Sequence, residues 1–119
     1  MTSRAHKASF LDFTSSEQKD LARILKTLTG GFDVLFARRF PYMMCIHQTP
    51  VNSPEDEGCK QSYHFHIEFY PPLRSETTVK YYASSEIGAW AACNPLRIED
   101  TAPALAAACR EFENTHVEL

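Results

Sequence analysis

Three histidines have the residue type and spacing of a metal-binding or phosphate-binding site. His64 and His66 stand two residues apart in a run rich in aromatic residues, and His47 closes an earlier apolar run. In an extended strand, residues two apart project from the same face, about 6.6 Å apart along the chain. Two imidazoles at that spacing can reach a single metal ion or a single phosphate group. The histidines therefore mark the first candidate site.

A strand over residues 62–70 is predicted to carry two of these histidines. Aromatic and β-branched residues dominate the run, and Pro71 and Pro72 close it. A period of two gives the strand one apolar and one polar face. The apolar face, which we expect to pack on a core, comprises Tyr63, Phe65, Ile67 and Phe69, and the polar face comprises His64, His66, Glu68 and Tyr70.

A second strand is predicted over residues 42–48, with His47 near its end. The segment over residues 49–60 contains prolines, a glycine and acidic residues, which predicts a solvated loop. This loop allows the two strands to run antiparallel, which places His47 across from His64 or His66. Three imidazoles from two strands suit Zn²⁺ or Fe²⁺, with one position left for a carboxylate or water. Glu68 is the nearest carboxylate in the sequence.

Two other interpretations of the histidines remain open. They can be surface or hydrogen-bonded side chains of a sheet, which is the usual case for a single histidine. Alternatively, His64 or His66 can act as a nucleophile that accepts a phosphoryl or nucleotidyl group. That role needs a phosphate cradle of glycine or basic residues, and neither type adjoins these histidines in the sequence.

A second candidate site lies further along the chain. Lys80, Tyr81, Tyr82 and Glu86 place a cation, two aromatic rings and a carboxylate close to a turn of small residues. An ammonium group binds phosphate, a ring contacts a base or sugar, and a carboxylate binds sugar hydroxyls. The combination suits a nucleotide sugar. The alternative is the solvated end of a possible short strand over residues 77–82.

Helical periodicity precedes the strands. Apolar residues recur at helical spacing over residues 21–36, and the segment Thr14–Glu17 matches a capping box at the start of the helix. Gly30 and Gly31 lie inside this stripe and each costs about 1 kcal/mol relative to alanine. The phase of the stripe continues across both glycines, so one continuous helix is predicted rather than a break.

The order of elements predicts the fold class. A last helix is predicted to be capped by Asp100 or Thr101, with Pro103 in its first turn. Helix, two adjacent strands, a possible third strand and helix predict an α+β domain with a small antiparallel sheet. So small a sheet leaves at least one unpaired edge. We therefore expect the chain to be part of something larger or to complete its sheet through another copy. The buried stripe of the last helix is predicted to comprise Leu105, Ala106, Cys109 and Phe112.

Composition limits the classes of protein to which this sequence can belong. The 119 residues suit one domain, and 44% hydrophobic residues suffice for a core. A net charge of −3, with no basic cluster larger than Arg38-Arg39, argues against nucleic-acid binding. No apolar run predicts a membrane span or a secretory signal. The 4 cysteines form no Cys-x-x-Cys pair, so reduced thiols in the cytoplasm are expected.

The motifs together resemble one known family. The segments that carry the resemblance are Phe40–Met44, His47–Pro50, His64–Arg74, Val79–Tyr81 and Ser85–Glu86. Across residues 5–115 the chain resembles the C-terminal half of galactose-1-phosphate uridylyltransferase. The resemblance implies an incomplete histidine-triad-like domain, one of two repeated halves. Enzymes of this family exchange UMP between UDP-glucose and galactose 1-phosphate through a covalent uridylyl-histidine.

The resemblance also implies roles for individual residues. His47, His64 and His66 match three histidines that bind iron or zinc in some members, with a glutamate of the N-terminal half as the fourth ligand. A second segment matches the part that reaches into the partner subunit's active site and holds the UDP-hexose, with Glu86 on the sugar hydroxyls. A homodimer, or association with an N-terminal half, is therefore implied. The matching residues of this segment are Lys80, Tyr81, Ala83, Ser85 and Glu86.

One absence distinguishes this sequence from a complete enzyme of that family. The family's nucleophile lies in a His-Pro-His-x-Gln motif that does not occur here, and Glu68 stands where a histidine triad has its third histidine. We therefore predict a single, truncated C-terminal domain over residues 1–119 that supplies metal and UDP-hexose contacts without a catalytic nucleophile. The alternatives are a stand-alone histidine-triad-like nucleotide hydrolase and a silent metal-binding dimerisation module.

Overall fold

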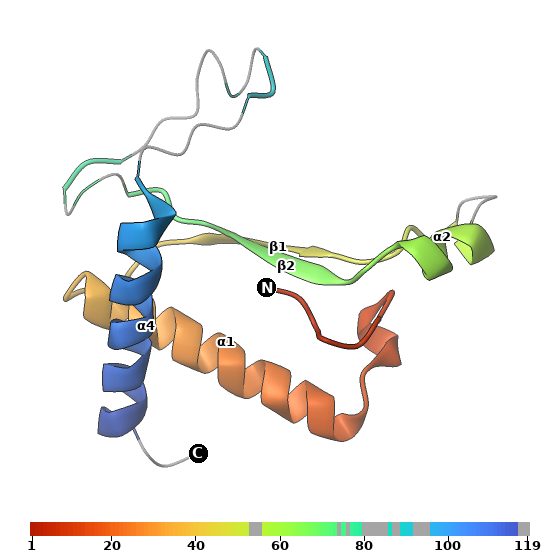
Figure 1. The fold of residues 1–119 in the computed structure, drawn as a ribbon, viewed down its shortest axis with the longest axis horizontal. Helices are drawn as coiled ribbons and strands as arrows, with labels where there is room; N and C mark the ends of the chain where they lie inside the picture. The colour runs from red at the N-terminus through yellow and green to blue at the C-terminus, as the bar shows by residue number, and fades with distance from the viewer. Residues whose placement is uncertain are drawn as a thin grey trace. The chain divides into compact units, whose positions relative to one another are not determined.

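The computed structural model describes residues 1–52, 56–73, 75, 77–79, 86, 89–91 and 96–116. Helices and two paired strands form the described chain, which confirms the predicted α+β class (Figure 1). The elements in chain order are the 3₁₀ turn η1 (Phe10–Asp12), α1 (Ser15–Leu35), β1 (Met43–His47), α2 (Asp56–Ser62), β2 (His66–Tyr70) and α4 (Ile98–Thr115).

The chain divides into two compact units. The first unit contains Met1–Leu21 and Tyr42–Tyr70, and the second contains Ala22–Pro41 and Pro71–Leu119. Both strands belong to the first unit, and α4 belongs to the second. In the described part of the chain, none of the helices combines the length and the apolar character that a membrane crossing requires.

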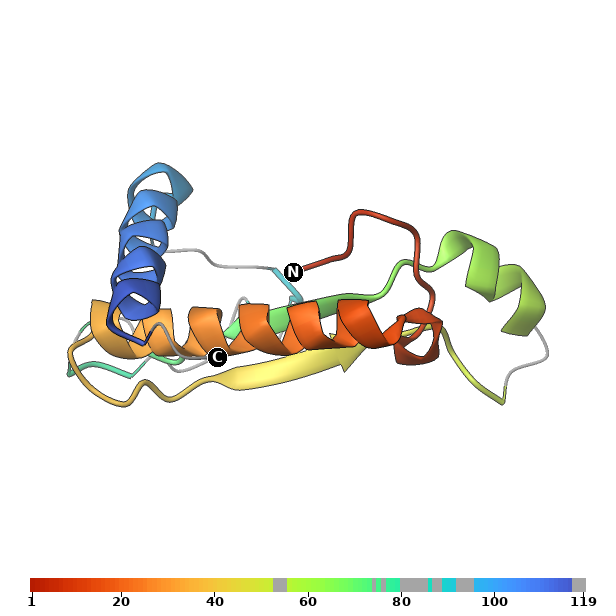
Figure 2. The same ribbon diagram turned by 90° about the horizontal axis from the view of Figure 1, so that it is seen from below.

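The two strands form an antiparallel pair, as predicted. Their register places His47 opposite His66 and Met43 opposite Tyr70. Figure 2 shows β1 and β2 running alongside each other. On the other edge of β2, Thr2 forms an isolated bridge with His66. The strand pair therefore brings the end of β1 and the start of β2 to the same place.

The core of the first unit lies under one face of β2. Phe65 and Ile67 are 2% and 1% exposed, which confirms the predicted apolar face at its centre. The Phe13 ring meets the Phe65 ring edge to face with centroids 5.0 Å apart, and Phe10 lies 6.3 Å from it. Alternation along the strand leaves the opposite face of β2 for polar side chains.

The connection between the strands differs from the predicted loop. Residues 49–60 were expected to form a solvated loop, but α2 occupies Asp56–Ser62. The predicted strand over residues 62–70 therefore starts too early, and β2 begins at His66. A helix of two turns is too short to show a hydrophobic period, so its pattern could not be distinguished from that of a loop.

Helix α1 is continuous across its glycines, as predicted. The capping box is present: the Glu17 backbone N–H donates to Thr14 Oγ1 at 3.3 Å, and the Thr14 N–H donates to Glu17 Oε2 at 2.7 Å. The helix ends at Leu35, one residue before the predicted stripe ends. Within the second unit, a Cβ added to Gly31 would lie 3.2 Å from the Cys109 backbone.

Helix α4 begins earlier than predicted. Its N-cap is Arg97 rather than Asp100 or Thr101, because the Arg97 carbonyl already accepts the N–H groups of those two residues, and its first residue is Ile98. Pro103 consequently lies inside the helix. The one fully buried residue described in α4 is Ala108, whereas the predicted Ala106 is exposed and Leu105, Cys109 and Phe112 are half-buried.

Candidate metal centre

The polar face of the strand pair gathers two histidines and one glutamate. His66 and Glu68 are two residues apart on β2 and therefore share a face, and the register adds His47 from β1. One ligand atom from each of His47, His66 and Glu68 lies within 4.8 Å of the other two. All three residues belong to the first unit.

The distances within this group suit a metal ion. His47 Nε2 lies 3.3 Å from Glu68 Oε2, and His66 Nε2 lies 3.6 Å from Glu68 Oε1. Two nitrogen ligands of a tetrahedral zinc ion are roughly 3.3 Å apart, since each zinc–nitrogen bond is about 2.0–2.1 Å long. The two imidazole rings are almost parallel, with an interplanar angle of 7° and centroids 4.6 Å apart.

Hydrogen bonding sets the orientation of His66. Its Nδ1 lies 3.0 Å from the backbone oxygen of His64. A carbonyl oxygen can only accept, so Nδ1 is the donor, and in the neutral ring Nε2 then has the lone pair that a metal ion requires. Histidines that bind metals are typically fixed through the second ring nitrogen in this manner.

His47 supplies the second nitrogen. Its Nε2 is buried and has no hydrogen-bond partner among the described residues, although the Glu68 carboxylate is nearby. Buried polar atoms are normally satisfied, and an unsatisfied one indicates a missing water or ion. Two imidazoles and a carboxylate are a donor set that both zinc and iron accept. The residues therefore fit a metal ion.

The electrostatics keep the Glu68 carboxylate ionised. The Tyr70 hydroxyl donates a hydrogen bond to Glu68 Oε2 and lowers the pKa of that carboxyl, and the charges of His47 and His66 lower the pKa further, against the opposing effect of partial burial. A carboxylate must be deprotonated to bind a metal. Sequence reasoning noted Glu68 and placed Tyr70 on the same face, but nothing in the sequence singled out their hydrogen bond.

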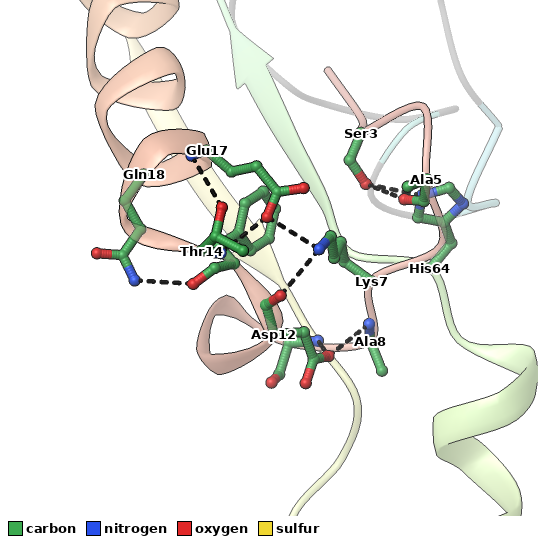
Figure 3. A network of polar contacts seen from close by, with 11 residues as sticks. Ser3, Ala5, Lys7, Ala8, Asp12, Thr14, Glu17, Gln18 and His64 are labelled. Atoms are coloured by element: carbon green, nitrogen blue, oxygen red, sulfur yellow. Dashed lines mark hydrogen bonds and ion pairs between the residues drawn. The ribbon is translucent and has the colours of Figure 1, made fainter.

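His64 occupies a different environment from the other two histidines. Its Nε2 lies 3.1 Å from Ser3 Oγ, and its ring centroid lies 5.5 Å from that of His6. Figure 3 shows the His64 ring beside Ser3 and Ala5 of the N-terminal segment. The structure thus brings His47 and His66 together, while the side chain of His64 contributes no atom to the group.

The predicted sugar-binding segment lies largely outside the described residues. Of its members, the structure describes Glu86, which is half-buried. The possible third strand over residues 77–82 is described as far as Val79, which forms a single bridge with Leu73. The members outside the described residues are Lys80, Tyr81, Ala83 and Ser85.

Comparison with known proteins identifies the family. The whole chain, residues 1–119, matches the family described as "Galactose-1-phosphate uridyl transferase, C-terminal domain". A galactose-1-phosphate uridylyltransferase of Thermotoga maritima is 38% identical over 116 residues, which cover 98% of this chain and 33% of that protein. The Saccharomyces cerevisiae protein of the same name is 44% identical over 86 residues, or 71% of this chain and 23% of its own length.

Solved structures agree with the sequence relatives. One described as "Structure of uridylyltransferase" superposes with a TM-score of 0.78 at 28% identity, over 92% of this chain and 33% of that chain. A uridylyltransferase mutant gives the same TM-score and identity over 35% of its chain. The chain thus spans about a third of the length of the Thermotoga maritima relative. It belongs to the family of galactose-1-phosphate uridylyltransferase C-terminal domains.

Proposed function

We propose that this chain acts in the exchange of UMP between UDP-glucose and galactose 1-phosphate as the C-terminal part of a larger assembly. The observation that carries the proposal is the His47–His66–Glu68 group on a chain that matches the C-terminal family domain from end to end. The chain corresponds to about a third of its Thermotoga maritima relative. The assembly is therefore either a homodimer or a complex with an N-terminal half.

The metal of this centre is zinc or iron. His47 and His66 hold it through Nε2, and the bound ion supplies a cross-link between the end of β1 and the start of β2. The sequence resemblance adds His64 as a third imidazole ligand, whereas the geometry offers Glu68 in that role. A metal titration of variants, described below, decides between these two ligand sets.

The chain contributes the sugar side of the substrate site rather than the nucleophile. Lys80 is proposed to bind phosphate and Glu86 the sugar hydroxyls of a UDP-hexose, in accordance with their charges. In the proposed centre His66 Nδ1 donates to the His64 carbonyl and its Nε2 holds the metal ion. This arrangement leaves it poorly suited to accept a uridylyl group. The remaining members of the substrate segment are Tyr81, Ala83 and Ser85.

A chimaeric enzyme tests the proposal. The matching C-terminal third of the Thermotoga maritima relative is replaced by these 119 residues, and conversion of UDP-glucose and galactose 1-phosphate is measured. We expect the chimaera to transfer UMP and the isolated chain to be inactive. Glu86→Gln in the chimaera should lower kcat/KM at least tenfold, since a charged hydrogen bond contributes about 1.5–3 kcal/mol.

The matched control is Glu111→Gln, an exposed glutamate on α4. It makes the same chemical change away from the substrate segment and should leave kcat/KM within twofold. A folded chimaera without activity, or turnover by the isolated chain, would contradict the proposal.

A further inference from the structure

We infer that Glu68, oriented by Tyr70, is the carboxylate ligand of the metal centre, so that this chain binds the ion with residues of its own strand pair. The inference rests on the metal centre within the proposed function. It departs from the arrangement implied by the resemblance, in which three histidines act with a glutamate of the N-terminal half. One coordination position then remains for water or a group from outside the chain.

The position of Glu68 between the two rings supports this role. Its two carboxylate oxygens face different nitrogens: Oε2 lies 3.3 Å from His47 Nε2, and Oε1 lies 3.6 Å from His66 Nε2. Neither imidazole has another acidic partner in the group. A metal ion among these atoms would give His47 Nε2 a partner, and both histidines and the carboxylate would bind that ion.

Tyr70 is the positioning residue for this carboxylate. It follows Glu68 by two residues on β2 and therefore projects from the same face of the strand. Its hydroxyl donates to Glu68 Oε2, which holds the carboxylate in place without occupying Oε1. Outer hydrogen-bond partners of this kind typically change metal affinity 10- to 100-fold when they are removed.

His64 serves the centre through its backbone. Its carbonyl oxygen accepts a hydrogen bond from His66 Nδ1–H, while its own ring Nε2 lies beside Ser3 Oγ. Removal of the His64 side chain keeps that carbonyl. The geometry therefore predicts that the Glu68 side chain matters more for metal affinity than the His64 side chain does.

Metal titration of the 119-residue chain tests the inference. Zn²⁺ affinity is measured by calorimetry, and Co²⁺ is used as a spectroscopic probe of the ligand set. Glu68→Gln should weaken Zn²⁺ binding at least tenfold and change the Co²⁺ absorption spectrum. Tyr70→Phe should weaken binding about tenfold, with a smaller spectral change. His64→Ala should weaken binding less than Glu68→Gln does.

Two substitutions provide matched controls. Glu111→Gln removes a carboxylate charge on α4, and Tyr42→Phe removes a phenol hydroxyl next to β1. Both should bind Zn²⁺ with wild-type affinity. Circular dichroism establishes that each variant is folded, and Glu68→Asp replaces Glu68→Gln if the latter unfolds, with a shortened carboxylate that should weaken binding and shift the Co²⁺ spectrum.

Three outcomes overturn the inference. The first is Glu68→Gln with wild-type affinity together with loss of binding in His64→Ala, which would establish the three-histidine set. The second is Tyr70→Phe with unchanged affinity and spectrum. The third is a folded wild-type chain that binds neither ion. UMP transfer is measured in the chimaera and metal binding in the 119-residue chain, so failure of one proposal can be told from failure of the other.

Discussion

Hydrogen bonds lower the pKa of two carboxyl groups in the first unit, although partial burial acts in the opposite direction. The side chains of Glu17 and Glu68 are 38% and 43% exposed, yet the pKa of each is lowered. For Glu17 the largest cause is the hydrogen bond from the Thr14 backbone N–H, followed by the bond from Lys7. Hydrogen bonds to the ionised form favour it over the protonated form.

The Glu17 group gives a pH prediction at this scale. Lys7 Nζ lies 2.9 Å from Glu17 Oε2, and Figure 3 shows it between Glu17 and Asp12. The pKa of Glu17 is lowered from 4.5 to about 2. Since the folded-state value is the lower one, the stabilisation is present above pH 4.5 and is lost as the pH falls toward 2.

A carboxyl NMR titration measures this directly. Lys7→Met should raise the pKa of Glu17 toward its ordinary value, because the ammonium group no longer favours the carboxylate. Lys60→Met, at the end of α2, is the matched control and should leave the pKa of Glu17 unchanged. A wild-type Glu17 that titrates near 4.5 would contradict the described network.

At the residue scale, the strand pattern predicts part of the site. Alternation on β2 and an antiparallel partner placed His47 opposite His64 or His66, and the observed register selects His66. The environment of His64 could not be foreseen, because it depends on the N-terminal segment. The Phe65 N–H donates to the Lys7 carbonyl and the Ile67 N–H to the Met1 carbonyl, so that segment lies beside residues 64–67. No sequence period indicates such a contact.

At the scale of elements, the packing of two helices explains why Gly31 of α1 is a glycine. Gly31 lies so close to α4 that an added Cβ would meet Cys109 Sγ at 2.5 Å and the Cys109 backbone at 3.2 Å. A side chain can rotate away, but the backbone of α4 cannot. Glycine at this position therefore permits the close approach of two helices within the second unit, at the expense of helix propensity.

Alanine at this position should destabilise the protein although it favours the helix. Gly31→Ala gains about 1 kcal/mol of helix propensity. Overpacking costs typically about 1–3 kcal/mol, and fixed backbone atoms place this site at the upper end. Chemical denaturation should therefore show a net loss in the free energy of unfolding.

Gly58→Ala provides the comparison, since among the described residues beyond its own helical turns no atom lies within 4 Å of the added Cβ, and Gly58 is exposed on α2. It should stabilise the protein by up to about 1 kcal/mol. A stabilised Gly31→Ala variant would contradict the close packing of α1 against α4.

The elements differ in how far the sequence could predict them. A stripe of apolar residues and a capping box are strong signals, and α1 has both over its 21 residues. Helix α2 has 7 residues and neither signal. The start of α4 was misplaced because its N-cap residue is Arg97, whose side chain makes no capping hydrogen bond. Conventional capping side chains therefore pointed to later residues.

At the scale of the whole molecule, the two-strand sheet and the lack of a His-Pro-His-x-Gln motif in these residues both support the proposed larger assembly. The described sheet has two strands, and the chain matches about a third of its Thermotoga maritima relative. Small sheets need partners to cover their edges and faces. The sequence predicts dependence on a larger assembly, and this stays a prediction, so a completed substrate site could not be derived from these residues alone.

The most direct test of the account is to locate the uridylyl group in the working enzyme. The chimaera is incubated with UDP-glucose labelled in the uridylyl moiety, quenched, digested and analysed by mass spectrometry. We expect the label on a histidine of the portion that comes from the Thermotoga maritima relative, and all 5 histidines of this chain unlabelled. A covalent uridylyl group on His64 or His66 would contradict this expectation.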